Sequence, residues 1–243
     1  SEFWVDSIAP MIDVLMPCWL VNEELITLTR DAIDSLGKVN LIIIDNASTM
    51  GGGFLRDRAD IYIRNKENLG YAKAVNQGLK LSKNELKAIA NDDIRVSPNW
   101  QEVALEVFND NEKTYSCHFK MVNYDEPFDP GSLIAHTGRE KWCSSSFFVI
   151  KTNDPQLYDE NYLNSYDDYD YWFRIRQKGF KTAYTNKAAY QHHHSYSQKL
   201  IPERAARDEK NREYYKLKHG EYPDTQFVRM YPEQVNEPWM PMP

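Results

Sequence analysis

The sequence predicts an α/β fold in which helices flank a mostly parallel central sheet. Strand-like and helix-like segments alternate through the first hundred residues, which is the pattern of a right-handed parallel sheet. Residues 39–44 are rich in β-branched side chains, as in a parallel strand that is covered on both faces. Carboxylates follow two expected strands directly, Asp45 after one and Asp92-Asp93 after another. Ligands of such sheets bind at the carboxyl ends of the strands, so these residues mark a candidate site.

Apolar spacing and turn residues place the elements of the first half. A helix is expected over residues 22–36, where apolar residues recur three and four apart and Gly37 follows as a stop signal. A second helix is expected over 68–82. The first strand ends at Pro17. Strands are expected at residues 12–16, 39–44, 61–63 and 86–90.

The second half is less regular, and its elements are expected with a long connection between them. Residues 125–138 are predicted to form a loop. Residues 221–243 contain five prolines and are predicted to form an extended tail. Strands are expected at 115–122 and 144–150, and helices at 100–108, 169–178 and 203–219.

Composition disfavours several classes of protein. An apolar fraction of 42% supports a real core, and a net charge of -7 disfavours a nucleic-acid backbone as the main partner. Cys18, Cys117 and Cys143 are odd in number and widely spaced, which fits neither a disulfide framework nor a zinc site. We expect reduced thiols in a cytoplasmic protein, with Cys18 and Cys143 at buried strand positions. No signal peptide and no apolar run of about 18 residues are present, so no transmembrane helix is expected.

Asn91-Asp92-Asp93 is the strongest chemical motif. Two adjacent carboxylates at the end of a strand can hold a hard divalent cation, which in turn neutralises a diphosphate. Alternatively, the pair opens a solvated turn or caps the helix that starts near Pro98.

The segment 65–78 is the second motif. Gly70 would let the backbone approach a ligand at a helix N-terminus, where free N–H groups favour phosphate. The alternative is an ordinary helix with Asn68 as its N-cap and with Ala72, Val75 and Leu79 facing the core.

These motifs together resemble a known family. Pro17 after a strand, Asp45-Asn46-x-Ser48, the 65–78 segment and Asn91-Asp92-Asp93 follow one another as in the family 2 inverting glycosyltransferases, and most closely as in the rhamnosyltransferase-type branch. The resemblance covers residues 12–197. In the second half it rests on segments 147–151, 158–162 and 166–179.

The resemblance implies a GT-A fold, a Rossmann-like nucleotide-binding half followed by an acceptor-side half. It places Asp45 against a pyrimidine ring, Asp92 near the ribose and the metal, and Asp93 on the metal itself. Residues implied to contact the donor are Pro17, Asp45, Asn68, Gly70, Lys73, Asn76 and Asp92.

A histidine after the next strand is implied as a further ligand of Mn²⁺ or Mg²⁺. Here the chain has His192-His193-His194. Neighbours on a strand point to opposite faces, so His192 and His194 could share a side. A polar strand end with solvated rings is the alternative.

The family's Glu-Asp pair falls on Asp167-Asp168, which implies that Asp168 is the general base, with Asp167 next in line. A hydroxyl nucleophile must lose a proton, and a crowded, half-buried carboxylate has a pKa raised toward the working range. The alternative is that Asp167 caps the helix and Asp170 is favoured by its dipole.

Aromatic residues in the acceptor-side half could stack on sugar rings, although most such residues belong to the core. The candidates are Trp142, Tyr166 and Trp172.

The chain also departs from the family pattern at several positions. Asn91 replaces the first acid of the metal motif, Asp167 replaces the usual Glu, and serines occupy 144–146 where the family has small glycines. Residues 51–53 are glycines where an acid is usual shortly after Ser48.

The sequence is therefore interpreted as a metal-dependent inverting glycosyltransferase of polysaccharide biosynthesis, with a UDP- or dTDP-sugar donor and a glycan or other hydroxyl acceptor. We expect one domain over 1–220, comprising a donor half (10–95), an acceptor half (96–200) and a charged helix (201–220), followed by a tail (221–243). That helix could pack on the domain, touch a membrane surface or mediate dimerisation.

Two other functions remain open. A sugar-phosphate nucleotidylyltransferase should carry a glycine-rich, arginine-containing loop after the first strand, and residues 18–21 have none. A non-catalytic carbohydrate-binding domain would keep the fold without the chemistry.

Overall fold

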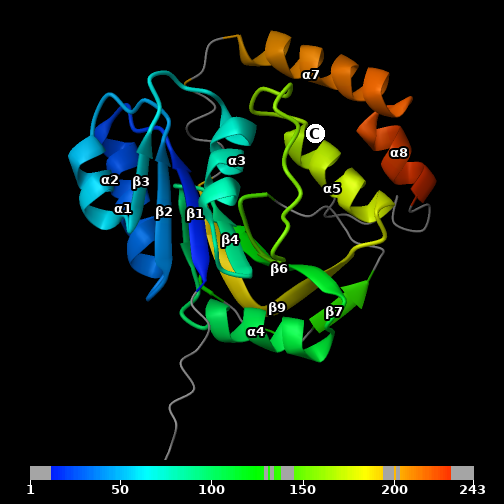
Figure 1. The fold of residues 1–243 in the computed structure, drawn as a ribbon, viewed down its shortest axis with the longest axis horizontal. Helices are drawn as coiled ribbons and strands as arrows, with labels where there is room; N and C mark the ends of the chain where they lie inside the picture. Colours follow the sequence, from blue (N-terminus) through cyan, green and yellow to red (C-terminus); the bar gives the residue numbers. More distant parts are fainter. Residues whose placement is uncertain are drawn as a thin grey trace, which may run out of the picture.

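The computed structural model describes residues 12–128, 131, 134–137, 145–193, 200 and 203–230, with the backbone alone described at 134–137 and 227–230. Its strands join into one sheet in the order β3-β2-β1-β4-β8-β6-β9-β5, with β7 paired to β9 (Figure 1). The strands are β1 Asp13–Cys18, β2 Asn40–Asp45, β3 Ile61–Arg64, β4 Leu86–Ala90, β5 Ile94–Val96, β6 Thr114–Asn123, β7 Ile134–Thr137, β8 Phe147–Lys151 and β9 Lys181–His192. The helices are α1 Glu23–Ser35, α2 Gly52–Arg58, α3 Tyr71–Leu81, α4 Trp100–Asp110, α5 Asp167–Gln177, α7 Arg204–His219 and α8 Pro223–Met230.

The predicted parallel sheet is confirmed in the first half of the chain. β1 pairs in parallel with β2 and β4, and β2 pairs in parallel with β3. The second half is mixed: β8 is antiparallel to β4 and β6, whereas β6 and β9 are parallel. The carboxyl ends of β1, β2 and β4 therefore meet at one edge of the sheet, where the candidate residues were expected.

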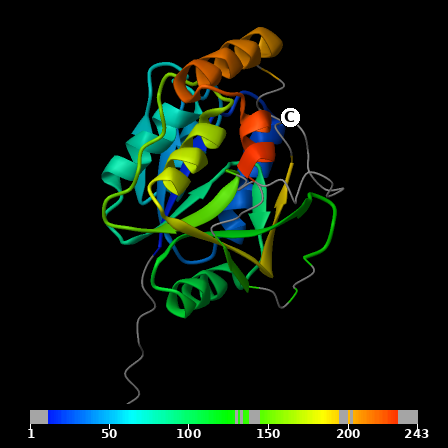
Figure 2. The ribbon, with the colours of Figure 1, turned by 90° about the vertical axis from the view of Figure 1, so that its right-hand side faces the viewer.

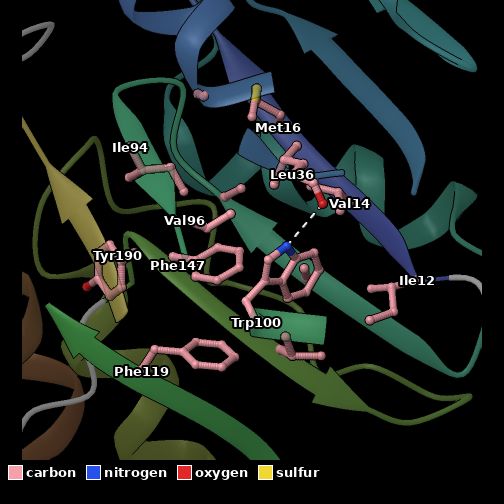
Figure 3. Close-up of a cluster of buried hydrophobic side chains, with 14 of the residues drawn as sticks. Ile12, Val14, Met16, Leu36, Ile94, Val96, Trp100, Phe119, Phe147 and Tyr190 are labelled. Atoms are coloured by element: carbon pink, nitrogen blue, oxygen red, sulfur yellow. Dashed lines mark hydrogen bonds between the residues drawn. The ribbon is translucent and has the colours of Figure 1, made fainter. Parts of the chain in front are cut away.

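Both faces of the sheet are covered, which is why β1 and β2 are almost entirely apolar. Val14 and Met16 face the cluster formed with α1, α2 and α4, and Leu15 faces the cluster formed with α3 and α5. In the first cluster Trp100 meets Phe147 edge to face at 5.2 Å, and its indole N–H donates to the carbonyl of Leu36 at 3.0 Å (Figure 3). The polar end of the buried indole is thus satisfied.

Several predicted boundaries need correction. Asn22, predicted as the first residue of a helix, is the N-cap of α1, and its Oδ1 accepts from Leu25 N at 2.9 Å. Asn68 is not the N-cap of α3, because Gly70 has a φ of 84° and the helix starts at Tyr71. α2 was not predicted; it starts after Gly51, whose φ of 68° turns the chain out of the preceding loop.

Residues 125–138, predicted as a loop, contain β7, which pairs antiparallel with β9. Part of the predicted tail is α8, which starts at Pro223, a residue whose fixed φ suits the first turn of a helix. Residues 231–243 lie outside the described residues.

α7 packs on the domain, one of the three roles expected for the charged helix. It crosses the top of the molecule above α5 in Figure 1 and again in Figure 2. His219 at its end meets Phe173 of α5 edge to face at 4.8 Å. Among the described helices, none combines the length and the apolarity that crossing a membrane requires.

Candidate active site

The end of β4 brings Asn91, Asp92 and Asp93 to the sheet edge, where the two carboxylates are 7% and 4% exposed. Asp92 Oδ2 accepts from the backbone N–H of Trp19, which follows β1, at 3.3 Å. Burial, followed by the negative charge of Asp93, raises the pKa of Asp92 to about 7. Two adjacent buried carboxylates repel one another when both are ionised. A bound cation would relieve this repulsion, so the site favours a positively charged ligand.

Asp93 and His192, two of the predicted metal ligands, lie next to each other in the structure. His192 ends β9, and its Nε2 lies 3.2 Å from Asp93 Oδ1. Asp93 Oδ1 and Asn91 Oδ1 are buried oxygens that accept no hydrogen bond from the described residues. Carboxylate and imidazole are ligand types that suit Mn²⁺.

The described residues include no cluster of three His, Cys, Asp or Glu side chains that could hold an ion. His193 turns aside to pack against Tyr124 with ring centroids 5.1 Å apart, and His194 lies outside the described residues.

Ser146, the residue before β8, contacts the Asp93–His192 pair through His192. Its Oγ lies 3.3 Å from His192 Nδ1, on the opposite side of the ring from Asp93, and its carbonyl accepts from Asn91 N at 2.8 Å. Such outer contacts fix the ring orientation of metal-binding histidines.

Asp45 at the end of β2 is fully buried, and its two oxygens have donors from the chain itself. Oδ1 accepts from Ser48 N at 2.8 Å, and Oδ2 accepts from Tyr62 Oη at 2.5 Å and pairs with Arg64. A hydrogen bond from a pyrimidine ring to Asp45 Oδ2, as predicted, would compete with Tyr62 and Arg64 for this oxygen. The Arg64 side chain is 46% exposed, so it has room to move.

The segment before α3 contacts residues 163 and 164, which lie far along the chain. A Cβ on Gly70 would lie 2.9 Å from Leu163 Cδ1, and Tyr71 N donates to Asn164 Oδ1 at 2.6 Å. The 163–164 segment thus contacts Gly70 and the first amide of α3. The side-chain oxygen Oδ1 of Asn68 accepts hydrogen bonds from Asn46 Nδ2 and from Gly70 N, at 3.0 Å each.

Two other predicted donor contacts have different surroundings. Asn76 is buried, and its Nδ2 donates to Tyr158 O at 2.9 Å while its Oδ1 accepts from Tyr158 N at 2.8 Å. These two hydrogen bonds hold the backbone at Tyr158 against α3. Lys73 is exposed on the same helix. Pro17 lies within β1, two residues before Trp19.

Asp167 and Asp168 are the first two residues of α5. Asp167 is 6% exposed; its Oδ1 accepts from Asp168 N at 3.1 Å, and its Oδ2 accepts from none of the described residues. Asp168 is half-buried, and its Oδ1 accepts from Tyr169 N at 2.8 Å. The N-cap position belongs to Tyr166, with a φ of 63° and no side-chain cap, so the prediction that Asp167 caps the helix is wrong.

Burial dominates the acidity of this pair. Burial and the adjacent charge of Asp168 raise the pKa of Asp167 to about 7, and burial also raises the pKa of Asp168. Asp170 differs from both. Burial acts to raise its pKa, but hydrogen bonds from His219 and Lys218 outweigh that effect and hold it below the usual value.

Trp172 of α5 and Tyr71 of α3 both donate hydrogen bonds to Ser145, close to the start of α5. Trp172 Nε1 donates to Ser145 Oγ at 3.3 Å, and Tyr71 Oη donates to Ser145 O at 2.9 Å. Burial and the charges of Asp167 and Asp168 raise the pKa of Tyr71, so its ring lies in the field of the pair.

Among the three predicted acceptor platforms, Trp172 is a core residue. It is 1% exposed and packs edge to face on Phe148 at 5.0 Å, so it offers no ring face to a sugar. Tyr166 is half-buried beside Tyr169, with ring centroids 5.5 Å apart, and keeps this candidate role. Trp142 lies outside the described residues.

Ser145 and Ser146 are the residues that the sequence reasoning missed. Adjacent in the chain, they contact α5 on one side and the Asp93–His192 pair on the other. Their signal was present, since serines replace the family's glycines at these positions, but its meaning depends on contacts that only the fold makes.

Comparisons with known proteins identify the family and support the fold. The model of glycosyl transferase family 2 matches residues 13–195. No curated protein sequence matches.

Solved structures share the fold at low sequence identity. Staphylococcus aureus TarS 1–349 superposes with a TM-score of 0.58 at 14% identity, covering 74% of this chain and 59% of that one. Its complex with UDP gives a TM-score of 0.56 at 13% identity, with the same coverage. GalNAc-T7 with UDP, GalNAc and Mn²⁺ gives a TM-score of 0.61 at 13% identity, covering 77% of this chain and 44% of that one. The chain thus spans only about half the length of these proteins.

Proposed function

The chain belongs to glycosyl transferase family 2, and from that premise we propose that it transfers a sugar from a nucleoside-diphosphate sugar to an acceptor hydroxyl with inversion. One observation carries the proposal. A continuous line of contacts runs from Asp93 through His192 and Ser146 to Ser145 and Trp172 of α5. It joins a pair suited to a metal and a diphosphate to a helix that starts with two carboxylates of raised pKa.

The two ends of this line have complementary tasks. Asp93 and His192 would hold the divalent ion, which when bound neutralises the departing diphosphate. Asp168, half-buried and facing less protein than Asp167, takes the proton from the acceptor hydroxyl. Its raised pKa makes it a stronger base than an exposed aspartate. An acceptor held at Asp168 attacks from the side opposite the diphosphate, and inversion follows.

We propose a UDP or dTDP donor. UDP is the nucleotide in the TarS complex and in GalNAc-T7, and Asp45 lies at the end of β2, at the same sheet edge as Asp92. Arg64 would release Asp45 to the pyrimidine ring on binding. A glycan or another hydroxyl compound is the acceptor, approached past Tyr166. The buried free thiols Cys18 and Cys117 support a reducing, cytoplasmic setting.

The direct experiment measures nucleoside diphosphate released from UDP- and dTDP-sugars, with and without Mn²⁺ or Mg²⁺, alongside thermal shifts with the free nucleotides. Turnover that needs a divalent ion is expected. Nucleotide binding without any turnover would favour a binding domain instead. Pyrophosphate release from a nucleoside triphosphate would favour a nucleotidylyltransferase.

The pH dependence of kcat/KM should report the carboxylate pair. The base must be ionised, and burial holds the pKa of Asp168 at a raised value, which should set the acid limb of the profile. We expect kcat/KM to fall about tenfold per pH unit below that value. In Asp167→Asn the like charge is gone, so the acid limb should move to lower pH. An unchanged acid limb in this variant would contradict the coupling.

The free energy of unfolding should fall as the pH rises toward the raised pKa of Asp167, whereas kcat/KM should rise. A carboxyl whose folded pKa is raised stabilises the fold fully below its unfolded pKa near 3.8, and this contribution is lost as the pH rises to about 7. We therefore expect Asp167→Asn to be more stable than the wild type at pH 8, by on the order of 4 kcal/mol, and equally stable near pH 4. Denaturant unfolding at the two pH values measures the difference; an equal gain at both would argue against a buried ionised carboxylate.

A further inference from the structure

The four residues before the carboxylate pair form a loop whose backbone needs support. Asn164 and Tyr166 have φ angles of 56° and 63°, in the left-handed region that non-glycine residues seldom adopt. Each such residue costs roughly 1 kcal/mol and persists only where the surroundings hold it. We call residues 163–166 the pre-catalytic loop, because Asp167 and Asp168 follow it directly.

Asn211 of α7 holds this loop from one side. Its side chain is buried at 4% exposure, and its Nδ2 donates to Leu163 O at 3.0 Å, Ser165 O at 3.1 Å and Ser165 Oγ at 2.8 Å. Its Oδ1 accepts from Leu163 N at 3.4 Å. One amide therefore replaces, for two loop residues, the backbone pairing that a regular element would supply.

α3 holds the loop from the other side. Asn164 Oδ1 accepts from Tyr71 N, and the absence of a side chain at Gly70 makes room for Leu163 and Asn164. The pre-catalytic loop is thus held between α3, which binds the left-handed Asn164 directly, and Asn211 of α7, which binds the residues on either side of Asn164.

The far end of α7 grips α5 just after the pair. Lys218 Nζ and His219 Nε2 lie 2.6 Å and 2.7 Å from Asp170 Oδ1, two residues beyond Asp168. Arg174 reaches the other oxygen of Asp170 at 2.7 Å. α7 therefore contacts the chain on both sides of the pair, while lying beyond residues 13–195, the part that the family model covers.

We propose that Asn211 is a positioning residue for glycosyl transfer: by fixing the pre-catalytic loop it sets the direction in which Asp168 points. This inference rests on the proposed function and assigns α7 to the catalytic unit. Because a displacement of the order of 1 Å at a catalytic group can cost about a hundredfold in rate, a lost loop contact should act on the chemical step.

The experiment compares Asn211→Ala and the near-isosteric Asn211→Asp, which lacks both N–H donors, with Asn211→Gln, which keeps the amide. Tyr214→Phe is the matched control, since its hydroxyl on the same helix donates to Asp159 Oδ2 at 3.0 Å, outside the loop. We expect kcat to fall tenfold to a hundredfold in the first two variants, with KM for the donor and the Kd of UDP changed less than threefold. Asn211→Gln should recover part of kcat, and Tyr214→Phe should stay near the wild type.

Amide hydrogen exchange of residues 163–170 in the substrate-free protein supplies a readout that does not depend on activity. Faster exchange there in Asn211→Ala, and wild-type exchange in Tyr214→Phe, are expected. Unchanged kcat or unchanged exchange in a folded Asn211→Ala protein would overturn the inference, as would an equal loss of kcat in Tyr214→Phe. A wild-type protein that turns over no donor defeats the proposed function instead, and the exchange rates then still decide whether Asn211 fixes the loop.

Discussion

Replacing Asp168 with asparagine is expected to lower kcat by about a thousandfold, with the Kd of the nucleotide nearly unchanged. A positioned general base contributes about 10² to 10⁴ to the rate, and the asparagine side chain keeps the shape but accepts no proton at neutral pH. The fold should survive, because an asparagine Oδ1 can still accept from Tyr169 N as Asp168 does at 2.8 Å. Steady-state kinetics with a fixed donor and isothermal titration with UDP separate the two effects.

The exposed Asp57 on α2 provides the matched control, since Asp57→Asn makes the same chemical change away from the site. Wild-type kcat is expected there. If Asp168→Asn kept more than a tenth of the wild-type kcat while Asp167→Asn lost a thousandfold, the base would be Asp167, whose Oδ2 accepts no hydrogen bond from the described residues.

Removing either member of the Asp93–His192 pair is the second large effect expected. Asp93→Asn and His192→Ala should weaken Mn²⁺ binding in the presence of UDP tenfold or more and lower kcat/KM by about a hundredfold or more, because each removes a ligand and leaves its partner buried. Electron paramagnetic resonance of free Mn²⁺ measures the binding without reference to turnover. His193→Ala is the control, because His193 packs on Tyr124 instead. Equal Mn²⁺ affinity in His192→Ala and the wild type would remove His192 from the metal site.

The first half of the fold could be predicted because its signals are local. Each strand there is a short apolar run, and each of α1 and α3 has apolar residues spaced for burial on one face. β5 and β7 gave no such signal. They contain three and four residues, and each is stabilised by pairing with β9, which lies far along the chain.

The site could be predicted in part for the same reason. Asp93, Asp167 and Asp168 lie at element ends that the sequence marks, so their backbone position follows from the pattern. The direction of a side chain depends on distant partners. Trp172 points into the core, where it packs on Phe148 and donates a hydrogen bond to Ser145. Gly70 makes room for the pre-catalytic loop, which lies more than ninety residues away in the sequence.

The central claim is that one site at the sheet edge joins a metal held by Asp93 and His192 to a base at the start of α5. A crystal structure with UDP and Mn²⁺, with the ion identified by its anomalous scattering, tests it most directly. The ion should bind within about 2.3 Å of Asp93 and His192, and the diphosphate should be coordinated to it. The free carboxylate oxygen of Asp168 should point toward the space beside the β-phosphate that the transferred sugar would occupy. An ion and diphosphate bound elsewhere, with Asp93 and His192 still in contact only with each other, would contradict the account.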